Sequence, residues 1–185
     1  MDDGTRILPL SVAQRRIWSL EEQSGGAFYR LPLAIPFLAP VNTTALRRGL
    51  QALVEQREAL RTVFETRDGE PVRKILPNLA ASLSVVDLAG MARDKQHAEA
   101  MRLAAEMAQG FDLARGPLWR LALLREQVDQ NMILIIMHHI ISDGWSVDIL
   151  LRELGNLYNR HLPPSEPPVA YADFLFWRLE HLEAR

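Results

Sequence analysis

The fold of this 185-residue chain is decided by one segment, Met132-Ile133-Leu134-Ile135-Ile136-Met137-His138-His139-Ile140-Ile141-Ser142-Asp143-Gly144-Trp145-Ser146. Its first six residues form an unbroken apolar run, which is typical of a strand buried on both faces. Ser146 is a suitable N-cap for a helix that reaches about Tyr158. Polar side chains therefore emerge where a buried strand ends and a helix begins, a common place for active sites in α/β sheets.

Outward from this segment, helical and extended patterns alternate. Apolar spacing and capping residues predict three more helices and several short strands. The helices are expected over residues 11–20, 42–54 and 94–109, and the strands over 28–38, 60–65, 72–76, 83–86 and 118–124. A further amphipathic helix is expected over 171–182, after a proline-rich connector. The fold class is α/β, a mixed β-sheet flanked by helices.

Three details of this pattern are specific enough to check. Asp68-Gly69 is a hairpin signal between two of the strands. Pro32 and Pro36 place their strand at a sheet edge or at bulges. The buried stripe of the 94–109 helix is expected to consist of Ala98, Met101, Ala105 and Ala108.

A histidine at the end of the buried strand has chemistry suited to catalysis. Its unperturbed pKa is roughly 6.5, so the neutral imidazole is available near pH 7. That imidazole can take a proton from an attacking amine or hydroxyl, or stabilise a developing oxyanion. Successive residues of a strand point to opposite faces, so we expect only one of His138 and His139 to face a crevice.

Residue types and spacing alone leave other readings open. Two adjacent histidines at a strand end are often half-buried structural residues. His138, His139 and Asp143 are also metal-ligand types, but adjacent strand residues diverge, and His97 and His161 lie in unrelated segments. We therefore expect no metal site.

Composition excludes several classes of protein. The chain is 48% hydrophobic, which supports a packed core, and it has no cysteine for disulfides, thiolate zinc sites or a thiol nucleophile. Its 21 basic and 23 acidic residues are mixed along the chain, so no nucleic-acid partner is expected. The N-terminus lacks the features of a signal peptide, and the longest apolar run is too short to span a membrane. We expect a soluble cytoplasmic protein.

Four segments, in order, resemble the first four core motifs of nonribosomal peptide synthetase condensation domains. The third segment, 138–146, matches His-His-x-x-x-Asp-Gly-Trp-Ser without departure. The second has Gln56-Arg57 where the family usually has Arg-His. The four segments are Ser-Val-Ala-Gln-Arg-Arg-Ile-Trp at 11–18, Glu-Ala-Leu-Arg-Thr-Val-Phe at 58–64, 138–146, and Tyr-Ala-Asp-Phe-Leu-Phe-Trp at 171–177.

The resemblance implies the chloramphenicol-acetyltransferase-like fold, in which two similar lobes enclose a cleft that holds the active site. Residues 1–185 are expected to form the N-terminal lobe of a condensation domain. The later motifs are absent, so we expect an excised or truncated piece that lacks the C-terminal lobe.

The resemblance also suggests residue roles. His139 corresponds to the catalytic histidine, which either accepts a proton from the attacking amine or holds the amine and the tetrahedral intermediate in place. His138 is expected to be structural. Asp143 is expected to point away from the cleft and form a buried ion pair with an arginine, for which Arg61 is the leading candidate.

The next two motif positions receive different roles: Gly144 is expected to line the donor side of the channel, and Trp145 to pack. Trp145 and the histidine pair also distinguish the chain from epimerization and heterocyclization members.

The function implied by the resemblance is amide-bond formation between a donor acyl or peptidyl thioester and an acceptor aminoacyl thioester. Both substrates ride on 4′-phosphopantetheine arms, and no tightly bound cofactor is expected. The implied partners are donor and acceptor carrier-protein domains, the C-terminal lobe and a neighbouring adenylation domain. Two alternatives remain: a stand-alone acyltransferase that uses coenzyme A or a carrier protein, and a non-catalytic lobe that docks carriers. The isolated lobe is expected to be inactive or very weak.

Overall fold

The computed structural model of the chain describes residues 4–24 and 29–161. A four-stranded sheet at its centre has the order β2-β7-β6-β5, and a smaller sheet has the order β1-β4-β3. The elements are β1 (Arg6–Pro9), α1 (Val12–Ser24), β2 (Arg30–Phe37), α2 (Thr43–Gln56), the 3-10 turn η1 (Glu58–Arg61), β3 (Thr62–Arg67), β4 (Glu70–Ile75), β5 (Leu83–Asp87), α3 (Arg93–Met107), β6 (Trp119–Arg125), β7 (Asn131–His138) and α4 (Gly144–Arg160).

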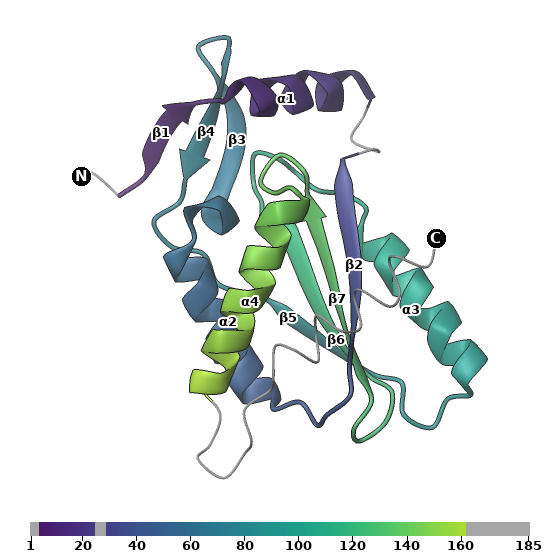
Figure 1. Ribbon diagram of the computed structural model, residues 1–185. Helices are drawn as coiled ribbons and strands as arrows, with labels where there is room; N and C mark the ends of the chain where they lie inside the picture. Colours follow the sequence, from purple (N-terminus) through teal and green to yellow (C-terminus); the bar gives the residue numbers. More distant parts are fainter. Residues whose placement is uncertain (1–3, 25–28, 162–185) are drawn as a thin grey trace.

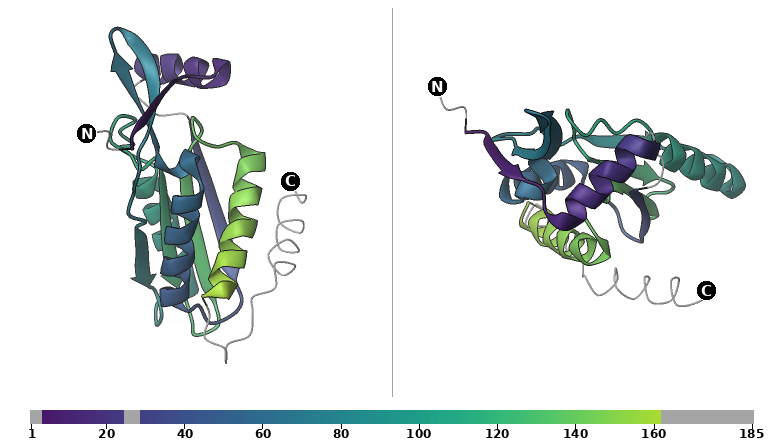
Figure 2. Two further views of the ribbon diagram at one scale, coloured as in Figure 1. Left: turned by 90° about the vertical axis from the view of Figure 1, so that its left-hand side faces the viewer. Right: turned by 90° about the horizontal axis from the view of Figure 1, so that it is seen from above.

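The large sheet is mixed and is covered by helices on both faces, as the sequence predicts. β7 runs antiparallel to β2 and β6, while β5 runs parallel to β6. Helices α2 and α4 pack on one face and α3 on the other (Figures 1 and 2). Seven of the eight β7 residues are buried. This burial confirms that the apolar run is a strand covered on both faces.

The smaller sheet and α1 sit at one end of the large sheet. Figure 1 shows α1 across the end at which β7 stops. A separate apolar cluster fills this junction; it includes Leu10, Phe64, Leu118 and Ile140, with Ile17 and Trp18 of α1 packed against it. The cluster joins α1 directly to the segment that follows β7.

Several details of the sequence analysis are confirmed. The sequence offers Asn42 or Thr43 as the cap of the second helix, and the structure uses Asn42, which accepts a hydrogen bond from the backbone N–H of Ala45. Asp68 and Gly69 both have positive φ, 53° and 82°, as a tight hairpin turn requires. The strand with Pro32 and Pro36 is an edge strand of the large sheet. The sequence patterns do not predict the short strand β1.

The predicted buried stripe of α3 is wrong. Met101 is 61% exposed, and Ala98 and Ala105 are also exposed. The side that meets the sheet carries Gln96, Ala100, Leu103, Ala104 and Met107. Alanines occur on several sides of this helix, so apolar spacing alone does not single out one face. The helix predicted over 171–182 and the fourth motif lie outside the described residues.

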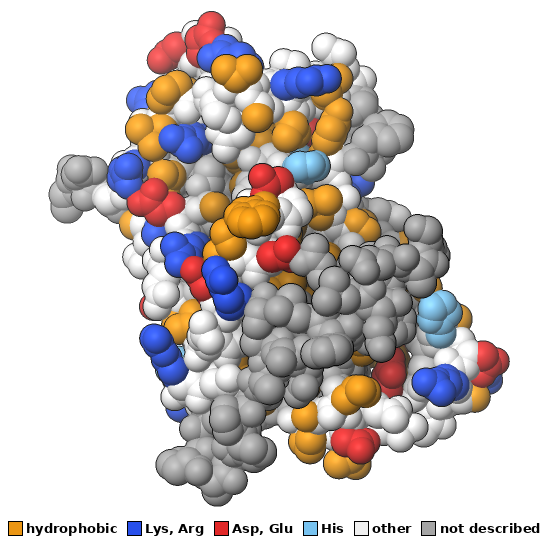
Figure 3. All heavy atoms as spheres, in the orientation of Figure 1, with side chains coloured by type: hydrophobic (Ala, Val, Ile, Leu, Met, Phe, Trp, Pro, Cys, Tyr) orange, Lys and Arg blue, Asp and Glu red, His pale blue; other side chains and the backbone are white. Residues whose placement is uncertain are grey.

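None of the described helices is long and apolar enough to cross a bilayer. Figure 3 shows basic and acidic side chains mixed over the face it presents.

Helices α2 and α4 approach each other closely at Gly49. A Cβ added there would lie 3.0 Å from the backbone nitrogen of Tyr158 and 3.2 Å from the carbonyl carbon of Leu157. These are backbone atoms, so the helices must move apart to make room. Arg57, just after α2, also forms a two-point ion pair with Glu153 of α4.

We predict that Gly49→Ala lowers the free energy of unfolding by about 1–2 kcal/mol. Overpacking destabilises the fold by about 1–3 kcal/mol, and the higher helix propensity of alanine offsets up to about 1 kcal/mol of this loss. Urea unfolding of the 185-residue chain followed by circular dichroism measures the change.

Gly155→Ala is the matched control, because a Cβ at this α4 glycine would meet no atom within 4 Å. This variant should be more stable than the wild type by up to about 1 kcal/mol. Equal effects of the two substitutions would contradict the close crossing of α2 and α4.

Candidate functional site

The candidate site is the turn at residues 139–143, between the end of β7 and the start of α4. The backbone N–H of His138 donates to the carbonyl oxygen of Leu118 at 2.9 Å, and that of His139 donates to Tyr29 at 2.7 Å. The N–H of Ile141 then donates to the carbonyl oxygen of His138 at 3.1 Å. Backbone hydrogen bonds to the segments beside the two neighbouring strands, β6 and β2, therefore hold the backbone of both histidines at the start of the turn.

His138 is buried, with 1% of its surface exposed. Its Nδ1 lies 3.1 Å from the backbone nitrogen of Ile140, and its Nε2 lies 2.8 Å from Oε1 of Glu21 on α1. A backbone N–H can only donate, so Nδ1 is the acceptor and Nε2 carries the proton. The ring also meets Phe111 edge to face, with the ring centres 6.0 Å apart. These contacts are those of a structural histidine.

Burial lowers the pKa of His138 from its ordinary value. The Glu21 carboxylate opposes this effect, while the charges of Arg30 and His139 act in the same direction as burial. A neutral ring agrees with the hydrogen bonds, because a protonated Nδ1 could not accept from Ile140.

His139 is only partly buried and is held differently. Its Nδ1 lies 2.6 Å from the carbonyl oxygen of Ser142. A carbonyl can only accept, so Nδ1 carries the proton, and Nε2 of the neutral ring keeps a lone pair that this bond does not use. The adjacent histidines therefore hold opposite tautomers. Of these two histidines, His139 is the one that combines an accepting Nε2 with partial exposure.

Asp143 does not pair with Arg61, so this prediction is wrong. Asp143 is exposed and is the N-cap of α4, where its Oδ1 accepts from the backbone N–H of Ser146 at 2.7 Å and from the Ser146 hydroxyl. These bonds, the hydroxyl first, lower the pKa of Asp143. Ser146, expected as the N-cap, lies three positions further on and completes a capping box.

Arg61 instead binds backbone carbonyl oxygens around the end of α2. It donates to Val54 at 3.0 Å and Glu55 at 3.3 Å, and also to Leu76 and Pro77. The last carbonyls of a helix have no partner within the helix, so a nearby guanidinium satisfies them well. Arg61 is thus an anchor between α2 and the chain that follows β4.

Trp145 does not pack within the described residues, contrary to expectation, because 78% of its surface is exposed. Val147, two positions later, is buried against the sheet. Side chains two positions apart on an α-helix differ in direction by roughly 200°, so Trp145 points away from the sheet that Val147 contacts. A Cβ on neighbouring Gly144 would also meet nothing within 4 Å. The first turn of α4 therefore presents an open surface beside His139.

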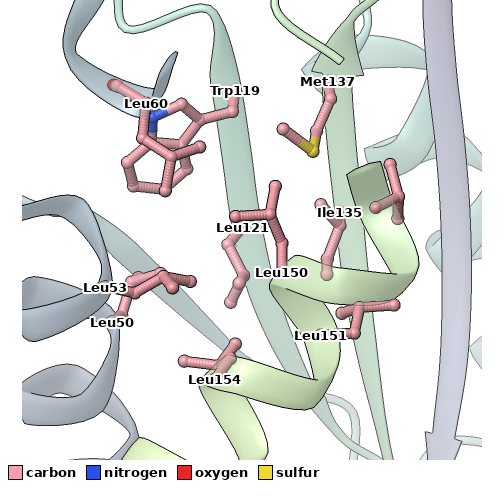
Figure 4. Close-up of a pocket in the computed structure, with 11 residues that line it drawn as sticks. Leu50, Leu53, Leu60, Trp119, Leu121, Ile135, Met137, Leu150, Leu151 and Leu154 are labelled. Carbon is pink, nitrogen blue, oxygen red and sulfur yellow. Dashed lines mark hydrogen bonds between the residues drawn. The ribbon is translucent and has the colours of Figure 1, made fainter. Parts of the chain in front are cut away.

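A small apolar cavity of about 30 Å³ lies between α2, α4 and the sheet (Figure 4). The indole N–H of Trp119 donates to the carbonyl oxygen of Leu60 at 2.9 Å, so the polar atom of this wall residue is already hydrogen-bonded. No pattern in the sequence indicates this cavity. It is lined by Leu50, Leu53, Leu60, Trp119, Leu121, Ile135, Met137, Val147, Leu150, Leu151 and Leu154.

Two contacts from α1 to the turn are not predicted by the sequence. Glu21 binds His138, and the Gln14 side-chain amide donates to the carbonyl oxygen of Ile140 at 3.3 Å. Gln14 and Glu21 are seven residues apart and therefore share one side of α1. The signal in the sequence is a pair of polar residues at this spacing around apolar Ile17 and Trp18. Among the described residues, no group of three or more potential ligands could hold a metal ion.

The fold and this turn define an α/β lobe whose central strand delivers one buried and one accessible histidine. The condensation-domain family model matches residues 5–185, and the chain belongs to this family. Cyclosporin synthetase simA of Tolypocladium inflatum is 41% identical over 176 residues, which is 91% of this chain and 1% of that synthetase. Malpinin synthetase of Mortierella alpina is 40% identical over 181 residues, which is 95% of this chain and 2% of that synthetase.

Solved structures show the same fold. The first condensation domain of the calcium-dependent antibiotic synthetase superposes with a TM-score of 0.78 at 24% identity, covering 90% of this chain and 41% of that one. The starter condensation domain of the rhizomide synthetase RzmA gives 0.76 at 23% identity, covering 96% and 44%. The chain thus has the chloramphenicol-acetyltransferase-like fold of condensation domains and spans less than half of either structure.

We predict that Asp143→Ala lowers the free energy of unfolding by about 1 kcal/mol, because it removes the N-cap of α4. Asp143→Asn should stay close to the wild type, since asparagine caps helices as well as aspartate does. Urea unfolding of the three chains measures the difference. A loss of about 3–5 kcal/mol in Asp143→Ala would instead indicate a broken buried ion pair and would contradict the capping role.

Proposed function

We propose that residues 1–185 form the N-terminal lobe of a condensation domain that makes an amide bond. The donor is an acyl or peptidyl thioester, and the acceptor is the amine of an aminoacyl thioester. Both are carried on the 4′-phosphopantetheine arms of carrier proteins. The observation that carries the proposal is the geometry of His139: a partly exposed ring whose Nδ1–H is held by Ser142, so that Nε2 is left to accept.

The proposed reaction needs one group that accepts from nitrogen. The amine nitrogen attacks the thioester carbon, the C–N bond forms, and the C–S bond breaks as the tetrahedral intermediate collapses. The proton lost from nitrogen ends on the departing pantetheine sulfur. Nε2 of His139 either carries that proton or accepts a hydrogen bond that holds the amine, and both roles require the tautomer fixed by Ser142. An amine with a pKa of about 8 already supplies some free base near pH 7.

The remaining partners are part of the proposal. Relatives are long synthetases of which this chain spans a few per cent, which supports carrier, adenylation and C-terminal-lobe partners encoded in the same protein. The open first turn of α4, with exposed Trp145, suits a surface that meets one of them. Gly144 at this surface is proposed to line the donor side of the channel. The cytoplasmic location expected from the sequence remains a prediction.

In the complete domain, we predict that His139→Ala lowers the rate of amide formation by roughly 10²–10⁴-fold, the usual contribution of a positioned acid–base group. Donor and acceptor carrier proteins are loaded with aminoacyl-pantetheine, and intact-protein mass spectrometry follows transfer of the donor mass. His97→Ala is the matched control, because His97 is an exposed histidine on α3.

The outcomes separate the function from the residue. If the wild-type domain transfers no mass across several amino-acid pairs, the stand-alone acyltransferase or the docking lobe replaces the proposal. If His139→Ala and His97→Ala both match the wild type, amide formation stands and His139 has no catalytic role.

The isolated 185-residue chain should form product far more slowly than the complete domain, or not at all. Half of a cleft leaves the arms unpositioned, and preorganisation requires both walls. The same mass-spectrometric assay at equal protein concentration measures the ratio. Equal rates would show that the lobe is catalytically complete.

A further inference from the structure

Glu21 is a buried glutamate on α1, the helix that crosses the end of the large sheet. The residue is 9% exposed, and it lies 117 positions from its partner His138 in the sequence. A buried carboxylate is costly unless hydrogen bonds compensate it, and the hydrogen bond from His138 offsets part of this cost. Neighbouring Glu22 is exposed, as a glutamate on a surface helix usually is.

The Glu21 contact completes the hydrogen bonding of the His138 ring. The N–H of Ile140 donates to Nδ1, and Nε2–H donates to the carboxylate of Glu21. With a donor on one nitrogen and an acceptor on the other, a single tautomer and a single ring orientation satisfy both bonds. Of these two partners, Glu21 is the one that comes from outside the turn.

His138 also contacts the turn that holds His139 through its backbone carbonyl oxygen. The hydroxyl of Ser142 donates to the carbonyl oxygen of His138 at 3.2 Å, and the carbonyl oxygen of Ser142 accepts from Nδ1 of His139 at 2.6 Å. The same residue, Ser142, therefore rests on His138 and sets the tautomer of His139. The His138 ring is linked to this turn by the hydrogen bond from the Ile140 N–H, two residues before Ser142, so a shift of the ring would act on Ser142 through the turn backbone.

Helix α1 contacts the turn at a second place, Ile140. Gln14 donates to the carbonyl oxygen of Ile140, and Ile17 and Trp18 pack on the cluster that contains Ile140. Figures 1 and 2 show α1 crossing the end of the sheet at which β7 stops. The first and third sequence motifs are thus in direct contact.

We infer that Glu21 is a positioning residue for His139. It holds His138 as the Nε2–H tautomer, which keeps Ile140 and Ser142 in place, so that Ser142 selects the Nδ1–H tautomer of His139 and leaves Nε2 to accept from the amine. The inference deepens the proposed function and depends on it only for the effect on catalysis. The effect on the His139 tautomer can be measured without any substrate.

The test uses three variants of the complete domain: Glu21→Met, Glu21→Gln and the exposed control Glu22→Met. Methionine keeps the bulk but removes the acceptor, whereas the carbonyl oxygen of glutamine still accepts from Nε2–H. Glu21→Met should lower kcat by about 10–100-fold, by analogy with the loss seen when partners that orient metal-binding histidines are removed. The KM for either carrier protein should be unchanged. Glu21→Gln should recover most of kcat, and Glu22→Met should equal the wild type.

Nitrogen-15 NMR of the histidine rings supplies the second readout. The wild type should show His138 protonated on Nε2 and His139 protonated on Nδ1. In Glu21→Met, His139 should become a mixture of tautomers, and in Glu21→Gln it should not.

Each outcome decides the inference. Loss of thermal stability in Glu21→Met with unchanged kcat and an unchanged His139 tautomer would show a purely structural role and overturn it. If Glu21→Met does not fold, a wild-type spectrum with His138 protonated on Nδ1, or on both nitrogens, overturns it as well, and the Glu21→Gln variant tests recovery. If the wild-type domain makes no amide, the proposed function fails while the tautomer measurement still decides the role of Glu21.

Discussion

The alternation of side chains along β7 is the constraint on which the site depends. Because successive strand residues face opposite sides, a central strand that is buried on both faces cannot send two neighbouring histidines to the same place. His138 is committed to the interior beneath α1, and His139, the first residue beyond the strand, is left partly exposed. The motif contains two histidines with opposite tautomers because the sheet gives them opposite surroundings.

Hydrogen bonds to backbone groups then determine the tautomer of each histidine ring. A backbone N–H at Nδ1 of His138 and a backbone carbonyl at Nδ1 of His139 select which nitrogen carries the proton as long as Ile140 and Ser142 stay in place. Asp143 contributes indirectly, because it starts α4 and so ends the turn at a defined residue. Backbone partners within and beside the turn thus replace the distant ion pair that the sequence predicts for Asp143.

The errors of the sequence analysis have a common origin. The sequence predicts a pair between Arg61 and Asp143 because both are charged motif residues, but each has a closer backbone partner at a helix end. It predicts packing for Trp145 because that residue is large and apolar, yet its direction on α4 is set by Val147, which faces the sheet. In α3, alanines on several sides make two stripes equally plausible, and the contact with the sheet selects Ala100 and Ala104.

Local sequence determined the elements of this protein: an apolar run makes β7 a buried strand, Asn42 starts α2, and Asp68-Gly69 turns the hairpin. These features depend on residues a few positions apart, which is the range over which backbone sterics and side-chain periodicity act. The choice of His139 within the histidine pair is implied by the resemblance to condensation domains and not by spacing. Only the tertiary structure decided that Glu21 meets His138 and that Gly49 lets α2 and α4 touch. Such contacts join positions that lie far apart in the sequence, and they exist only after the layers have packed.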